Sequence, residues 1–123
     1  MPAFMDSEID DPELLSNAAG EIYRMRRARD RYLPKELTGE PAWDILLALY
    51  AEEPAKLPVS SLCFGSGAPQ TTALRWIAVL EKSGLIVRTQ HPRDPSVLLL
   101  ALTEQGRLLI ERSLKAMLRA ARP

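Results

Sequence analysis

The sequence predicts a mainly helical fold that carries a two-stranded β hairpin. Residues 69–83 have the apolar spacing of a short helix, and Gly84 follows as a residue suited to end it in the left-handed conformation. A strand, a turn at residues 91–95 and a second strand at residues 97–102 come next. Two helices joined by a short glycine-containing turn and followed by a hairpin are typical of a winged helix-turn-helix.

The chain divides into four predicted segments. Residues 1–10 are expected to be a disordered acidic leader, because residues 1–13 contain five acidic side chains and no basic one. Residues 11–40 are expected to hold a helix that runs to about residue 32, followed by a linker. Residues 41–103 make the winged-helix domain, and residues 104–123 make a C-terminal helix.

Signals at the ends of these segments favour the same helices. Asp11 can cap the first helix, and Pro12 suits its first position. Further helices are predicted at residues 41–53 and 59–65, and Thr103 is predicted to cap the last one.

Apolar spacing predicts the buried face of each long helix. For the first helix the predicted stripe is Leu15, Ala18, Ile22, Met25, Arg29 and Tyr32. For the second helix it is Trp43, Leu46, Leu47 and Tyr50, and for the last it is Ile110, Leu114, Met117 and Ala121.

Five arginines crowd the second half of the first helix. They are Arg24, Arg26, Arg27, Arg29 and Arg31. Two interpretations stay open for them: a solvated helix face, or contact with a DNA backbone.

The charges are balanced in sum but separated along the chain. The sequence has 16 basic and 16 acidic residues, so its net charge is zero. Residues 69–93 carry four basic residues and one acid, and residues 105–123 carry five basic residues and one acid. The charge of a local surface governs its contact with phosphates more than the net charge of the whole chain does. The basic regions are therefore compatible with nucleic-acid binding despite the zero sum.

Several functional classes fit the composition poorly. The single histidine, His91, falls in the predicted turn and is far in sequence from Cys63, so no nucleophile–base pair or zinc shell is expected. Residues 65–67 lack the lysine of a phosphate-binding loop. We expect no enzyme activity and no cofactor. Cys63 is interpreted as a buried apolar side chain, with a redox sensor as the alternative.

The chain also lacks signals for export or membrane insertion. The first ten residues have no basic start and no apolar core, and the longest apolar runs are far shorter than the ~20 residues of a membrane span. A cytoplasmic protein without a membrane partner is the expectation.

The helix at residues 69–83 is the predicted recognition element. On a 3.6-residue period its inner face is Ala73, Trp76, Ile77 and Leu80, and base stacking is the alternative role for Trp76. The predicted base contacts are Gln70, Thr71, Leu74 and Arg75. Glutamine can bond adenine and arginine can bond guanine, whereas leucine and the threonine methyl group suit the thymine methyl group. For Arg75, a phosphate contact is the alternative.

Residues 41–106 resemble the winged-helix domain of the MarR family of bacterial transcription regulators. The resemblance rests on Thr72 and Arg75, on Leu80-Glu81-Lys82-Ser83-Gly84-Leu85-Ile86, on Arg88 and Asp94, and on Leu102-Thr103-Glu104-Gln105-Gly106. It covers just over half of the chain. One position departs from the family pattern, because Ser96 stands where the wing usually carries an arginine that enters the minor groove.

The resemblance implies how the protein works. Members are dimers built from the N- and C-terminal helices, bind near-palindromic double-stranded DNA, and often act as repressors. A small lipophilic or phenolic effector releases DNA in some members, and others respond through a cysteine. In the DNA complex Thr72, Lys82, Arg88 and Arg93 are expected at the backbone, with Arg93 able to enter the minor groove in place of Ser96.

A second function stays open at this point. The same fold can serve as a protein–protein interaction module without specific DNA binding, and the zero net charge, Ser96 and the apolar Leu74 favour that alternative. The sequence does not name an operator, a regulated gene or an effector.

Overall fold

The computed structural model describes residues 10–30 and 41–120 of the chain. Within them lie helices α2 (Pro12–Asp30), α3 (Pro41–Glu52), α4 (Val59–Gly65), α5 (Gln70–Lys82) and α6 (Glu104–Ala120). The strands are β1 (Leu57–Pro58), β2 (Ile86–Gln90) and β3 (Leu98–Leu102). The order confirms the mainly helical winged helix-turn-helix. The predicted leader at 1–9, the linker at 31–40 and the stripe residues Tyr32 and Ala121 lie outside the described residues.

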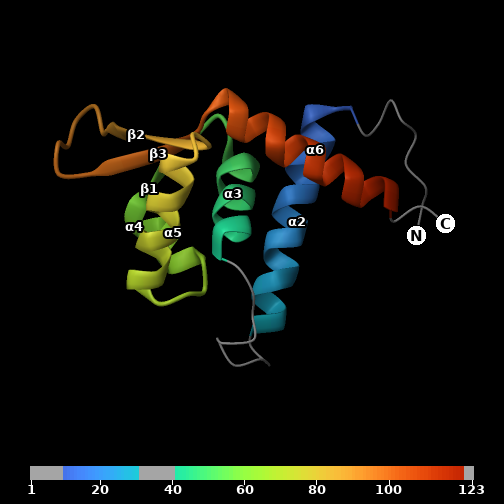
Figure 1. The fold of residues 1–123 in the computed structure, drawn as a ribbon, viewed down its shortest axis with the longest axis horizontal. Helices are drawn as coiled ribbons and strands as arrows, with labels where there is room; N and C mark the ends of the chain where they lie inside the picture. Colours follow the sequence, from blue (N-terminus) through green and yellow to red (C-terminus); the bar gives the residue numbers. More distant parts are fainter. Residues whose placement is uncertain (1–9, 31–40, 121–123) are drawn as a thin grey trace.

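The hairpin of β2 and β3 projects from the helices as a wing (Figure 1). The strands are antiparallel, and Ile86 pairs with Leu102 and Gln90 with Leu98. The short strand β1 pairs with the other edge of β3, so that the sheet order is β1-β3-β2. The sequence did not predict β1, because a strand of two residues, one of which is Pro58, gives no alternating pattern.

Helix α3 lies between α2 on one side and α5 on the other (Figure 1). The predicted face of α3 is confirmed for Leu46, Leu47 and Tyr50, which are buried, and Trp43 packs against the core while partly exposed. Leu15, Ile110 and Leu114 of the flanking helices are buried as predicted. The flanking helices therefore pack on the same core as the helix-turn-helix.

Two predicted core positions are wrong. The Met25 side chain is 70% exposed, and Met117 is 43% exposed. In α2, Leu15 is buried and Ile22 packs against the core as predicted, but the inward face also includes Ala19 and Tyr23, so it is shifted toward the following residues. The shift turns arginines inward and leaves the methionine outside.

The joint between α5 and α6 is tightly built. Gly84 has φ = 78°, as predicted for a left-handed helix end. The Thr103 hydroxyl accepts a hydrogen bond from the Gly106 amide at 3.0 Å and donates to the Gly84 carbonyl at 2.6 Å. The Thr103 amide donates to the Leu85 carbonyl at 3.0 Å. Thr103 thus caps α6 as predicted and also joins it to the end of α5.

Candidate nucleic-acid interface

Helix α5 has one buried face and one exposed face. Ala73 and Ile77 are completely buried, Leu80 is buried, and Trp76 is partly buried against the core. The core role of Trp76 is thereby favoured over base stacking. The burial follows the apolar 3.6-residue period, which holds the helix on the core in one rotation.

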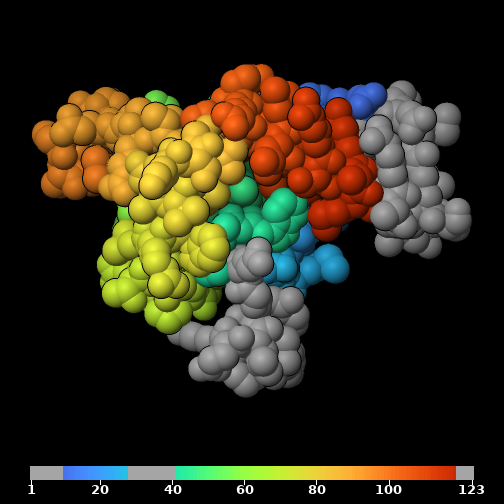
Figure 2. Space-filling view, viewed as in Figure 1, coloured from blue at the N-terminus to red at the C-terminus, as the bar shows by residue number. Residues whose placement is uncertain are grey.

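The four predicted base contacts lie together on the exposed face of α5. Gln70, Thr71, Leu74 and Arg75 are exposed, whereas Thr72 is half-buried. Figure 2 shows α5 on the molecular surface between the projecting wing and α6. No described element covers these side chains, so a groove of a duplex could reach them.

Two predicted backbone contacts lie near the end of α5 and on β2. Lys82 and Arg88 are both exposed. Arg88 is bound to Glu81 through Nε at 2.8 and 2.9 Å and through Nη2 at 2.7 Å, and this partner raises the pKa of the guanidinium. The carboxylate of Glu81 therefore competes with any phosphate for Arg88.

The wing turn is organised by side chains that bond to its own backbone. The His91 Nδ1 accepts hydrogen bonds from the amides of Arg93 and Asp94 at 3.0 and 3.2 Å. The Asp94 carboxylate accepts from the Ser96 amide at 3.0 Å and from its hydroxyl at 2.6 Å, and both bonds lower the pKa of Asp94. Ser96 therefore orders the turn instead of extending a cation from it, and Arg93 is the exposed cation of the turn.

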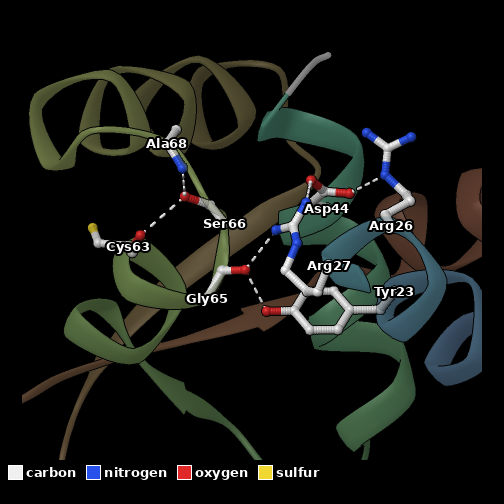
Figure 3. A network of polar contacts seen from close by, with 8 residues as sticks. All are labelled: Tyr23, Arg26, Arg27, Asp44, Cys63, Gly65, Ser66 and Ala68. Carbon is white, nitrogen blue, oxygen red and sulfur yellow. Dashed lines mark hydrogen bonds and ion pairs between the residues drawn. The ribbon is translucent and has the colours of Figure 1, made fainter. Parts of the chain in front are cut away.

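A polar cluster that the sequence did not predict connects α2 to the helix-turn-helix (Figure 3). Asp44 of α3 is buried and binds Arg26 and Arg27 of α2, the latter at 2.5 Å. The Gly65 carbonyl, at the end of α4, accepts hydrogen bonds from Tyr23 and from Arg27 Nη1, the second at 2.7 Å. For Arg26 and Arg27 both predicted roles are wrong, because these arginines bind a buried carboxylate. Asp44, an acid in the first turn of an otherwise apolar stretch of α3, was the signal that could have indicated it.

A cavity of about 320 Å³ lies beside this cluster. Its walls come from α2, α3 and α4 and include Ser16, Gly20 and Tyr23 of α2 and Gly65 of α4. It therefore lies between the N-terminal helix and the helix-turn-helix.

Cys63 is a buried side chain on α4, as predicted. Burial raises the pKa of the thiol. A raised pKa keeps the sulfur in its less reactive protonated form. The structure therefore favours a packing role for Cys63 over a redox role.

Solved structures similar to this chain are transcriptional regulators. The repressor CouR bound to a 23-mer DNA duplex is 29% identical, with a TM-score of 0.53, over 63% of this chain and 52% of that chain. The PcaV regulator from Streptomyces coelicolor, in complex with its natural ligand, is 25% identical, with a TM-score of 0.55, over 94% of this chain and 77% of that one. MepR of S. aureus in its DNA-binding conformation is 21% identical, with a TM-score of 0.58, over 79% and 72% of the two chains.

The chain has the fold of the MarR-type winged-helix regulators. No protein-family model matches the sequence, and no curated protein is significantly similar to it. The chain spans about half the length of CouR, and also about half that of a MepR mutant from a multidrug resistant S. aureus clinical isolate. In that fold α4 and α5 form the helix-turn-helix, and the β2–β3 hairpin is the wing. None of the described helices is long and apolar enough to cross a bilayer.

Proposed function

We propose that this chain is a sequence-specific DNA-binding transcriptional regulator that acts as a dimeric repressor of the MarR type. The observation that carries the proposal is the exposed face of α5, where Gln70, Thr71, Leu74 and Arg75 are all open to solvent in the first half of the helix. Residues 69–93, which contain this face, have a net charge of +3. Such a surface can read base edges and also neutralise phosphates. A regulator of this kind needs no catalytic residue, and we propose none.

The proposed contacts divide into two classes. Gln70, Thr71, Leu74 and Arg75 read bases, whereas Thr72, Lys82, Arg88 and Arg93 contact the backbone, with Arg93 at the minor groove. In a dimer the two recognition helices lie about 34 Å apart, one turn of DNA, on the same side of the duplex. Bound there, the dimer blocks RNA polymerase and so represses transcription.

The dimer is proposed to form through the flanking helices at 12–32 and 104–121. In α6 the side chains of Leu108, Leu109 and Met117 are large, apolar and exposed, and Met25 of α2 is as well. A second copy would remove this apolar surface from water.

An effector is proposed to occupy the cavity between α2, α3 and α4. Its volume of about 320 Å³ suits a small aromatic or lipophilic molecule. The PcaV structure holds a natural ligand, and the BpsR structure concerns regulation of DNA binding by 6-hydroxynicotinic acid. The cavity wall includes Tyr23 and Gly65. A ligand there would therefore lie against the hydrogen bond between Tyr23 of α2 and Gly65 at the end of α4.

The test is selection of duplexes from random-sequence DNA, followed by titrated gel shifts. Specific binding with a Kd of about 10⁻⁸ M or tighter at physiological salt is expected. Arg75→Ala should relax the preference at one base pair in each half-site, at a cost of about 1–3 kcal/mol. A matched variant, Lys82→Ala, should weaken all duplexes alike. No binding even at low salt would favour the protein–protein interaction module instead, for which the exposed Leu74 and Val79 are the supporting observation.

A further inference from the structure

Phe64 is the most exposed of the large apolar side chains in the described part of the chain. It is 93% exposed, although its neighbours Leu62 and Cys63 on the same helix are buried. Helix α4 therefore turns a phenyl ring into water while the rest of its apolar face packs on the core. Covering this ring with a partner would remove a large apolar area from water.

The ring lies beside the start of the recognition helix. Phe64 and Ser60 of α4 line an open hollow together with Pro69 and Gln70 at the beginning of α5. None of the described residues that line this hollow carries a charge. Figure 2 shows the yellow-green surface of α4 and the following turn continuing directly into the yellow surface of α5. Phe64 and the proposed base contact Gln70 thus share one surface.

We propose that Phe64 packs against the deoxyribose of a nucleotide in the DNA backbone, next to the base that Gln70 reads. The inference rests on the proposed DNA-binding function. In a helix-turn-helix the first helix crosses the sugar–phosphate backbone while the second enters the groove. Phe64 belongs to the first helix, and no carboxylate in the hollow repels the adjacent phosphates. A sugar offers an apolar face to the ring.

The salt dependence of DNA binding distinguishes this contact from the contacts of lysine and arginine with phosphates. Packing a ring on a sugar adds affinity without releasing a counterion and without reading a base. Phe64→Ala should therefore weaken every duplex by roughly three- to tenfold while leaving the slope of log K against log salt unchanged. Lys82→Ala should instead reduce that slope.

The experiment compares variants on one duplex that the wild-type chain selects from random DNA. Gel shifts at several salt concentrations are run for the wild type, Phe64→Ala, Phe64→Leu and a control, Val87→Ala. Val87 is an exposed apolar residue on β2, outside the hollow. Weaker binding by Phe64→Ala at unchanged slope, recovery with Phe64→Leu and no effect of Val87→Ala support the inference. Thermal melting of each variant checks the fold, which an exposed ring should affect little.

Four outcomes would overturn it. If Phe64→Ala binds as the wild type does while Arg75→Ala shows its expected loss, only the Phe64 contact is wrong. If no duplex is bound by the wild type, the proposed function fails as well. If replacing thymine by deoxyuridine weakens the wild type but not Phe64→Ala, the ring contacts a thymine methyl group and not a sugar. Sedimentation that shows a dimer only with Phe64 intact would assign the ring to a second copy.

Discussion

Arg27 Nη1 donates a hydrogen bond of 2.7 Å to the carbonyl oxygen of Gly65, at the end of α4. The same guanidinium binds the buried Asp44 through Nη2 at 2.5 Å. One side chain of α2 is therefore fixed both to the core helix α3 and to the turn that precedes the recognition helix. Any movement of α2 against α3 must strain or break these bonds.

Asp44→Asn should destabilise the fold by about 2–4 kcal/mol. The change removes the charge that two arginines share, and a buried pair that loses one partner leaves an uncompensated charge. The two arginine side chains are about a fifth exposed, so partial hydration keeps the loss at the lower end of this range. Urea unfolding measures the effect. Glu104→Gln, at a largely exposed ion pair with Arg107, is the control and should cost less than about 1 kcal/mol.

Gly106→Ala should destabilise the protein by about 2–4 kcal/mol. A Cβ at this position would lie 2.0 Å from the backbone oxygen of Leu85, so the joint between α5 and α6 would have to open. Gly20→Ala is the matched control, because its Cβ would meet the flexible end of Arg24 at 3.2 Å and the Ala51 Cβ at an ordinary contact distance of 3.8 Å. That variant should be neutral or gain up to about 1 kcal/mol from helix propensity. Equal melting temperatures for the two variants would contradict the close approach at Gly106.

Glu81→Gln should strengthen DNA binding, most at low salt. The carboxylate binds Arg88 and lies next to Lys82 in the chain, so its loss frees one cation and removes one repulsive charge. Each added phosphate contact steepens the slope of log K against log salt by about 0.9. Gel shifts over a salt series measure the slope. The double variant Glu81→Gln/Arg88→Gln should lack this steepening, and an unchanged slope in Glu81→Gln would remove Arg88 from the proposed interface.

The thiol of Cys63 should react slowly in the folded protein. Its burial raises its pKa, so little thiolate forms at neutral pH, and reactivity should rise only when the pH approaches the raised value or the fold opens. Absorbance with a chromogenic disulfide reagent, with and without denaturant, gives the two rates. Cys63→Ala should keep its DNA affinity in the presence of peroxide. Rapid labelling of the native protein would instead support a redox sensor.

Leu109→Glu should convert the proposed dimer to a monomer. Leu109 lies on the exposed side of α6, where a second copy would have to bury the new carboxylate without a partner. Sedimentation at micromolar concentration measures the mass. Arg112→Glu, a charge change at an exposed position of the same helix, tests whether charge alone matters. A wild-type monomer at that concentration would refute the dimer.

The recognition helix was predictable because its pattern is local. Ala73, Ile77 and Leu80 repeat at the helical period, and Gly84 marks the end, so the buried and exposed faces of α5 follow from the sequence. The wing was predictable for the same reason, since a strand rich in β-branched residues and an apolar strand flank a turn that contains Pro92 and Pro95.

The contacts between α2 and α3 could not be predicted from a local pattern. Asp44 and Arg27 are 17 residues apart, and only their packing brings them together. The rotation of α2 that directs Arg26 and Arg27 to that buried carboxylate leaves Met25 exposed, against the apolar spacing. The exposure of Phe64 could not be predicted either, because the burial of a single side chain on a short helix depends on what the rest of the fold covers.

The bonds of Thr103 to Gly84 and Leu85 have a consequence for the DNA that a dimer could accept. They leave no hinge between α5, which would contact the DNA, and α6, which would contact the second subunit. The two copies of α5 in a dimer would then lie at a fixed distance and orientation. A target with one extra base pair between its halves presents the second half rotated by about 34° around the duplex. The rigid joint could not follow that rotation, so spacing would be selected as strictly as sequence.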